Sequence, residues 1–158
     1  RLGLEFVLVN SSTFMGDLMS QLSLTPIFIS LFTIFYLFLS IRIGYFRGSP
    51  VLKLVFKMEE QTSDIKLQRN VRAHGNFSEY VPLFSILLLV AELLGQTSFG
   101  YLALICIVFS YGRVAHAICF AFYDYNPFLR ISGMICTYLP LAAISIDLLF
   151  NVYASFRA

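Results

Sequence analysis

The stretch that decides the fold is RNVRAHGNFSEYVP, residues 69–82, which runs directly into the apolar residues 83–94. Successive residues of an α-helix are rotated by about 100°, so a helix here places its polar side chains within an arc of roughly 100°. This polar stripe consists of Arg69, Arg72, Asn76, Glu79 and Tyr80. Because buried charges are costly unless paired, a stripe at the start of a membrane span must face protein or a water-filled cleft.

The composition is that of an integral membrane protein. Of 158 residues, 58% are hydrophobic and 13% are charged, against about 25% charged in a typical soluble domain. A soluble core of this size could not bury so much apolar surface. The net charge is +2 and no basic tract is present, so we predict no nucleic-acid partner. Cys106, Cys119 and Cys136 lie in apolar runs, which favours packing roles, and we predict no metal site.

Four apolar segments are long enough to cross a bilayer, which takes about 20 helical residues. The expected membrane-spanning helices cover about residues 26–45, 65–94, 99–123 and 128–153. Together they predict an all-α, four-helix transmembrane domain over residues 21–158. Residues 1–20 form an N-terminal extension for which two origins stay open, native sequence or sequence added during cloning.

Capping signals mark two of the expected helix starts. Thr25-Pro26 and Asn126-Pro127 each pair a residue suited to helix capping with a proline suited to the first helical position. Pro82 lies inside the second span, where we expect it to kink the helix.

Lysine and arginine positions predict the orientation. Four spans return both termini to one side of the membrane. Of 11 basic residues, nine belong to the opposite side: Arg42, Arg47, Lys53, Lys57, Lys66, Arg69, Arg72, Arg113 and Arg130. Because positively charged connections stay in the cytoplasm, we expect a multi-pass protein of a bacterial inner membrane with both termini extracytoplasmic.

The topology brings further polar residues towards the polar stripe. Arg113 and His116 are three residues apart near the end of the third span and so share a helix face, and Arg130 opens the fourth span. Cations gathered around Glu79 suit a small anionic ligand with an apolar part that reaches into lipid. An alternative is that Arg113 and His116 snorkel to the interface and that Arg130 contacts lipid phosphate or Asp124.

Three short motifs carry a family resemblance. In RAHGNFSEYVPLF, residues 72–84, Arg, Asn, Glu and Pro follow one another at a characteristic spacing. GRVAH at residues 112–116 and RISGM at residues 130–134 follow in the next two spans. This series resembles the MAPEG family, the membrane-associated proteins of eicosanoid and glutathione metabolism, and within it the small bacterial-type branch. The resemblance extends over about residues 22–155.

The resemblance implies a homotrimer with glutathione bound as co-substrate between neighbouring subunits, near the cytoplasmic side. The residues that it makes candidates for holding glutathione are Arg69, Arg72, Asn76, Glu79, Tyr80 and His116. In active transferases of the family an arginine stabilises the thiolate of glutathione, and Arg130 is the first candidate here and Arg113 the second. Arginine suits the two carboxylates of glutathione, and Glu79 suits its ammonium group.

Two positions depart from the family pattern. Gly44 stands where several members have an arginine, and Phe120 stands where eicosanoid-synthesising members have a tyrosine. The leading prediction is therefore a glutathione-binding membrane protein that conjugates or reduces lipophilic electrophiles, as a transferase or peroxidase, with catalysis left open. The alternative is a non-catalytic lipid-binding or scaffold protein. The expected partners are other copies of the chain, membrane lipids and a lipophilic small-molecule substrate.

Overall fold

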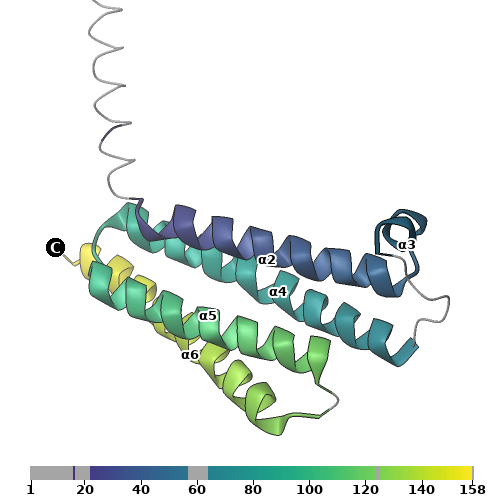
Figure 1. Ribbon diagram of the computed structural model, residues 1–158. Coiled ribbons are helices and arrows are strands. Elements are labelled where there is room, and N and C mark those ends of the chain that lie inside the picture. Colours follow the sequence, from purple (N-terminus) through teal and green to yellow (C-terminus); the bar gives the residue numbers. More distant parts are fainter. Residues whose placement is uncertain (1–15, 17–21, 57–63, 124, 158) are drawn as a thin grey trace, which may run out of the picture.

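In the well-described part of the chain, four long helices and one short helix make up the bundle (Figure 1). The computed structural model describes residues 16, 22–56, 64–123 and 125–157. In chain order the helices are α2 (Leu24–Phe46), α3 (Pro50–Phe56), α4 (Asp64–Leu94), α5 (Phe99–Phe122) and α6 (Pro127–Ser155). The four long ones are long and apolar enough to cross a membrane, which confirms the predicted all-α membrane bundle. The predicted extension over residues 1–20 lies outside the described residues, except for Gly16.

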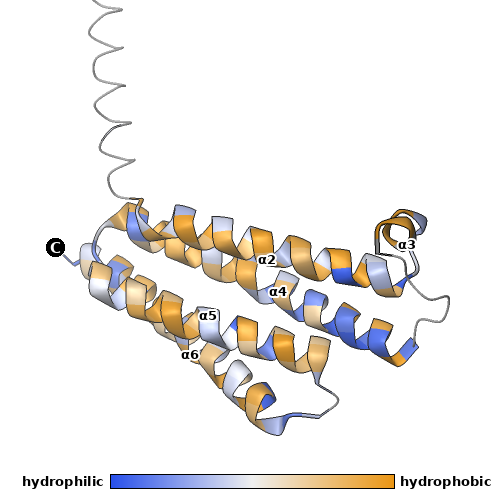
Figure 2. Cartoon of the chain, in the orientation of Figure 1, coloured by the Kyte–Doolittle hydropathy of each residue, from blue (hydrophilic) through white to orange (hydrophobic). Residues whose placement is uncertain are grey.

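The long helices run up and down beside one another, so the bundle has two ends (Figure 1). At the connection end, α2 leads into α3 and α4, and α5 leads into α6. At the terminal end, α2 begins, α4 turns into α5 and α6 finishes. The polar residues of α4 gather at the connection end (Figure 2). The polar stripe therefore lies at the same end as the start of α6.

Stacked phenylalanines join α2, α4 and α5 in the middle of the bundle. The rings of Phe84 and Phe109 are both fully buried, and they stack with their centroids 4.0 Å apart. Phe32 stacks on Phe28 at 4.3 Å and on Phe77 at 5.4 Å. Between helices in lipid, association rests on close packing more than on the hydrophobic effect. This aromatic cluster supplies such packing for α2, which begins the bundle.

Two glycines let α5 and α6 cross closely. A Cβ atom added at Gly112 would lie 2.7 Å from the carbonyl carbon of Cys136, closer than real Cβ contacts. A Cβ atom added at Gly133 would lie 3.0 Å from both the carbonyl oxygen of Gly112 and the Cβ atom of His116. Small residues at a crossing allow backbones to approach in this way. The crossing brings His116 directly against α6.

A carboxylate from α4 caps the beginning of α2. One oxygen of Glu92 accepts hydrogen bonds from the backbone N–H groups of Ser23 (3.1 Å) and Leu24 (2.7 Å), and the other accepts from Thr25 N–H (2.8 Å). These are N–H groups that the helix itself leaves unpaired, and the negative charge complements the helix dipole. The prediction that Thr25 caps α2 is wrong, because the helix begins earlier, at Leu24, where Glu92 supplies the acceptors.

The other two local predictions concern α4 and α6. The side chain of Asn126 accepts a hydrogen bond from Leu129 N–H at 3.0 Å, with Pro127 in the first turn, which confirms the predicted start of α6. Pro82 lies inside α4, and it does not end the helix, which continues from Asp64 to Leu94.

Candidate functional site

A small polar cavity lies between α4, α5 and α6, and we call it the inner cavity. Its volume is about 160 Å³. The side chains that line it are Asn76, Tyr80, Arg113, His116, Phe120, Arg130, Met134 and Tyr138. Five of these eight are residues that the sequence nominated for glutathione binding or catalysis, and the fold brings them together from three helices.

Arg113 is the buried cation of the inner cavity, with only 2% of its surface exposed. Its Nη1 atom donates a hydrogen bond to the backbone carbonyl of Asn76 at 2.9 Å, and its guanidinium carbon lies 4.8 Å from the centre of the Tyr80 ring. Its Nε–H has no hydrogen-bond partner among the described residues. The alternative in which Arg113 snorkels to the interface is therefore wrong. A buried N–H without an acceptor carries a desolvation cost, which a ligand oxygen would relieve.

Aromatic side chains complete the walls of the inner cavity. The hydroxyls of Tyr80 and Tyr138 are hydrogen-bonded at 3.2 Å and connect α4 to α6. The ring of Phe120 lies between the His116 ring, at 4.9 Å, and the Arg130 guanidinium, at 5.7 Å. His116 is itself buried. The cavity thus offers hydrogen-bond donors and a positive charge inside an aromatic frame, a set that suits an anionic oxygen or sulfur.

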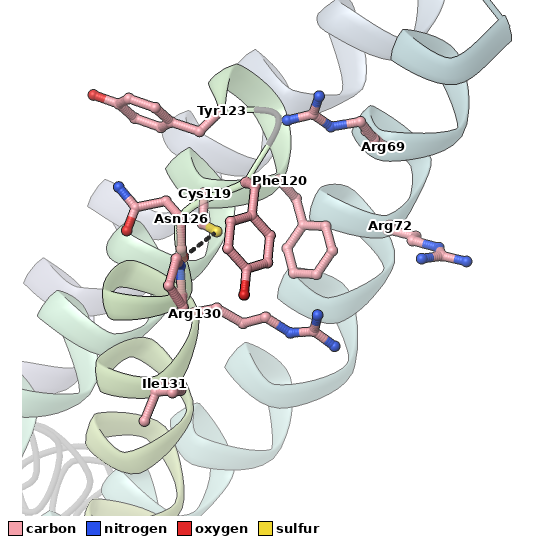
Figure 3. A pocket seen from close by; sticks show the side chains of 10 residues that line it. Arg69, Arg72, Cys119, Phe120, Tyr123, Asn126, Arg130 and Ile131 are labelled. Carbon is pink, nitrogen blue, oxygen red and sulfur yellow. Dashed lines mark hydrogen bonds between the residues drawn. The ribbon is translucent and has the colours of Figure 1, made fainter.

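A wider cavity opens towards the connection end, and we call it the outer cavity (Figure 3). Its volume is about 510 Å³. The residues that line it are Arg69, Arg72, Cys119, Phe120, Tyr123, Tyr125, Asn126, Pro127, Arg130 and Ile131. Phe120 and Arg130 line both cavities. Figure 3 shows Arg130 reaching from α6 towards α4, whereas Arg72 points outward.

The predicted site residues are thus distributed unequally. Asn76, Tyr80, Arg113, His116 and Arg130 line the inner cavity. Arg69 and Arg72 lie on the outer cavity with Arg130. Glu79 is an exposed residue of α4 and lines neither cavity.

The sequence did not single out Tyr138, although a signal was available. Tyr138 follows Arg130 by eight residues on α6, with Met134 halfway, so the three lie along one side of the helix within about 80°. All three line the inner cavity. A search for residues that share a face with Arg130 would have found it.

Arg42, which the sequence analysis counts among the basic residues of the cytoplasmic side, is bonded within the protein. It donates from Nε to the side-chain oxygen of the buried Asn70 at 2.9 Å, and from Nη2 to the carbonyl of Ala121 at 3.0 Å. Its guanidinium lies 4.0 Å from the centre of the Phe122 ring. Arg42 therefore fastens α2 and α4 to the end of α5, next to the outer cavity.

The comparison with protein families agrees with this arrangement. The model of the MAPEG family matches residues 25–150, which include all of α4 and α5, α2 without its first residue and α6 without its last five residues. The chain belongs to the MAPEG family. A search of curated proteins found no match to it. MAPEG proteins are membrane proteins, and members of the family use glutathione. Both cavities of this MAPEG protein lie inside the matched residues.

Proposed function

We propose that this MAPEG protein binds glutathione across the inner and outer cavities and presents its thiolate to lipophilic electrophiles. The observation that carries the proposal is Arg113, a buried cation whose Nε–H has no acceptor among the residues that the structure describes. Glutathione has two carboxylates, one ammonium group and one thiol. Arginines from α4, α5 and α6 around the two cavities match its anionic groups.

The positions of the charges suggest how glutathione lies. Its carboxylates would meet Arg113 in the inner cavity and, in the outer cavity, Arg69 or an Arg72 side chain turned inward from the outward position that Figure 3 shows. Its sulfur would then lie between the cavities, near Arg130, which lines both. Glu79, exposed on the same stripe of α4, would meet the ammonium group of glutathione where a neighbouring subunit completes the site.

The chemistry that this arrangement supports is nucleophilic attack by sulfur. A nearby arginine favours the thiolate over the thiol, and the thiolate is the nucleophile. Arg130 is the first candidate for this role and Arg113 the second. Holding the thiolate beside an electrophile that arrives from the bilayer supplies proximity, so no covalent enzyme intermediate is needed. The products would be a glutathione conjugate or a reduced lipid.

The site also supports assembly with further copies of the chain. Glu79 lies 15 residues before the end of α4, which is about 22 Å along a helix and so within a hydrocarbon core about 30 Å thick. An exposed carboxylate at that depth needs protein around it. We propose a homotrimer in which a neighbour covers this part of the polar stripe. We also propose that the connection end is cytoplasmic, because the basic residues gather there.

A specific observation favours a non-catalytic binding or scaffold protein as the second candidate. Several family members have an arginine at the position of Gly44. Arg42 does not take the place of that arginine, because it is hydrogen-bonded to Asn70 and Ala121. Phe120 contributes a ring and no hydrogen-bond donor to either cavity. Such a protein would bind glutathione or lipid without activating the sulfur.

Equilibrium dialysis against glutathione and its diethyl ester tests the proposal. The ester keeps the peptide, ammonium and thiol groups but has no carboxylates. Glutathione should bind saturably and the diester at least about tenfold more weakly, because each charge-assisted hydrogen bond contributes about 1.5 kcal/mol or more. Equal binding of the two compounds, or none of either, would contradict the proposal. Glutathione conjugation by the purified protein then separates the catalytic function from the scaffold.

A further inference from the structure

Tyr138 occupies an unusual place for a tyrosine in a membrane protein. It lies 11 residues into α6 and 17 before its end, about 16 Å and 25 Å along the helix, whereas exposed tyrosines favour the membrane interfaces. Its side chain is 46% exposed. Tyr138 nevertheless lines the inner cavity, and its hydroxyl meets the hydroxyl of Tyr80 at 3.2 Å. One side of Tyr138 is thus on the outer surface and the other is on the candidate site.

The hydroxyls of Tyr80 and Tyr138 together have one more O–H donor than their mutual hydrogen bond uses. Two phenols carry two O–H groups, and the hydrogen bond between Tyr80 and Tyr138 uses one of them. Either hydroxyl can be the donor of that bond, so within the described part of the chain one O–H, of Tyr138 or of Tyr80, can be donated to a molecule in the cavity. An oxygen of a ligand at this place would accept that hydrogen bond.

The surroundings suit the transfer of that proton. The Arg113 guanidinium, which we assign to a carboxylate of glutathione, lies 4.8 Å from the centre of the Tyr80 ring, so glutathione bound there would lie next to the tyrosine pair. Met134 and Phe120 supply apolar walls on either side. Arg130, our candidate for holding the thiolate, lines the same cavity.

We propose that Tyr138 is a further catalytic residue, which donates a proton to the oxygen leaving group of a lipophilic hydroperoxide that enters past its exposed side. This proposal rests on the proposed function. The thiolate of glutathione attacks the outer peroxide oxygen and the O–O bond breaks. The electron pair leaves with the inner oxygen, which takes the Tyr138 proton and departs as an alcohol. The sulfur becomes a sulfenic acid, which a second glutathione converts to glutathione disulfide and water, and solvent returns the proton to Tyr138.

Tyr138→Phe tests this assignment because it removes only the hydroxyl. The purified protein would be assayed with glutathione and two lipophilic substrates, a fatty-acid hydroperoxide and chlorodinitrobenzene. Chloride leaves without a proton, so the second substrate does not need the donor. We expect kcat/KM for the hydroperoxide to fall by about 100-fold, the lower range for a positioned proton donor. The rate with chlorodinitrobenzene and the KM for glutathione should stay at the parent's values.

Tyr111→Phe is the matched control. Tyr111 is 45% exposed, and its hydroxyl also contacts another hydroxyl, that of Ser132, at 3.2 Å, but it lines neither cavity. It should leave both rates unchanged. Equal losses with both substrates in Tyr138→Phe, or no loss with either, would overturn the donor role and leave the proposed function standing. A parent protein that turns over neither substrate would overturn the catalytic proposal together with this one.

Discussion

The Nη1 atom of Arg113 on α5 donates a hydrogen bond to the backbone carbonyl of Asn76 on α4, 2.9 Å away. This contact joins two of the motifs that the sequence offered separately, one in the second span and one in the third. It also holds a cation against the inner cavity, and the Nε–H of that cation has no acceptor in the described part of the chain. The hydrogen bond to Asn76 gives the charged side chain of Arg113 a partner inside the largely apolar helix α5.

Arg113→Met should separate binding from stability. Methionine of similar length removes the cost of burying a charge but leaves the carbonyl of Asn76 without this donor, so we expect the two effects to offset and thermal unfolding in detergent to stay near the parent's midpoint. Glutathione affinity should fall by at least about tenfold, because the buried donor is lost. Calorimetry and a thermal melt on one preparation measure both. A variant that melts at a lower temperature than the parent but binds glutathione with parental affinity would reverse this assignment.

Glu92→Ala should destabilise the bundle without touching the site. The change leaves three backbone N–H groups at the start of α2 without their acceptors. We expect a loss of about 2 kcal/mol in the free energy of unfolding, which lowers the melting midpoint by about 4–8 °C for a chain of this size. Glu79→Gln, an exposed carboxylate on the same helix, is the control for loss of charge. If both variants melted alike, the cap would have no special part in stability.

Gly112→Ala should disturb the crossing of α5 and α6. The added methyl group would meet the backbone of Cys136 at 2.7 Å, where no flexible side chain can move aside. Overpacking of this kind costs about 1–3 kcal/mol. Gly100→Ala, also in α5 but with no atom within 4 Å of the added carbon, is the matched control and should melt at or slightly above the parent's midpoint. A parental melt for Gly112→Ala would mean that the two helices are less closely fixed.

Much of the fold could be predicted from the sequence because its signals are local. Hydropathy marks the long helices, and the start of α6 follows from Asn126 and Pro127 alone. The start of α2 could not be predicted, since its acceptor, Glu92, lies 68 residues after Leu24 in the chain. The contact between Arg42 and Ala121, 79 residues apart, is hidden for the same reason.

The sequence predicts which residues form the candidate site better than it predicts how deeply those residues are buried. Spacing and family resemblance nominated Arg113, but a cation near the end of a span can either snorkel or lie buried. The close crossing at Gly112 and Gly133, which depends on the packing of two helices, decides for burial. Tyr138 belongs to the cavity through its place on the same side of α6 as Arg130, which no family motif marked.

Cysteine labelling tests the proposed orientation. Single cysteines replacing Ser63, in the connection between α3 and α4, and Ser155, at the end of α6, would be placed in a cysteine-free background. An impermeant maleimide added to intact cells should label position 155 and not position 63, because the connection end carries the basic residues. Labelling of position 63 alone would invert the topology.

Calorimetric titration of glutathione into the detergent-solubilised protein tests the central claim most directly. The parent should give a saturable heat of binding. Arg72→Ala and Glu79→Gln should each weaken the affinity by at least about tenfold, whereas Arg157→Ala, which removes a basic residue at the terminal end, should bind as the parent does. A parent that shows no heat of binding, or stripe variants whose affinities equal the parent's, would contradict the assignment of glutathione to this site.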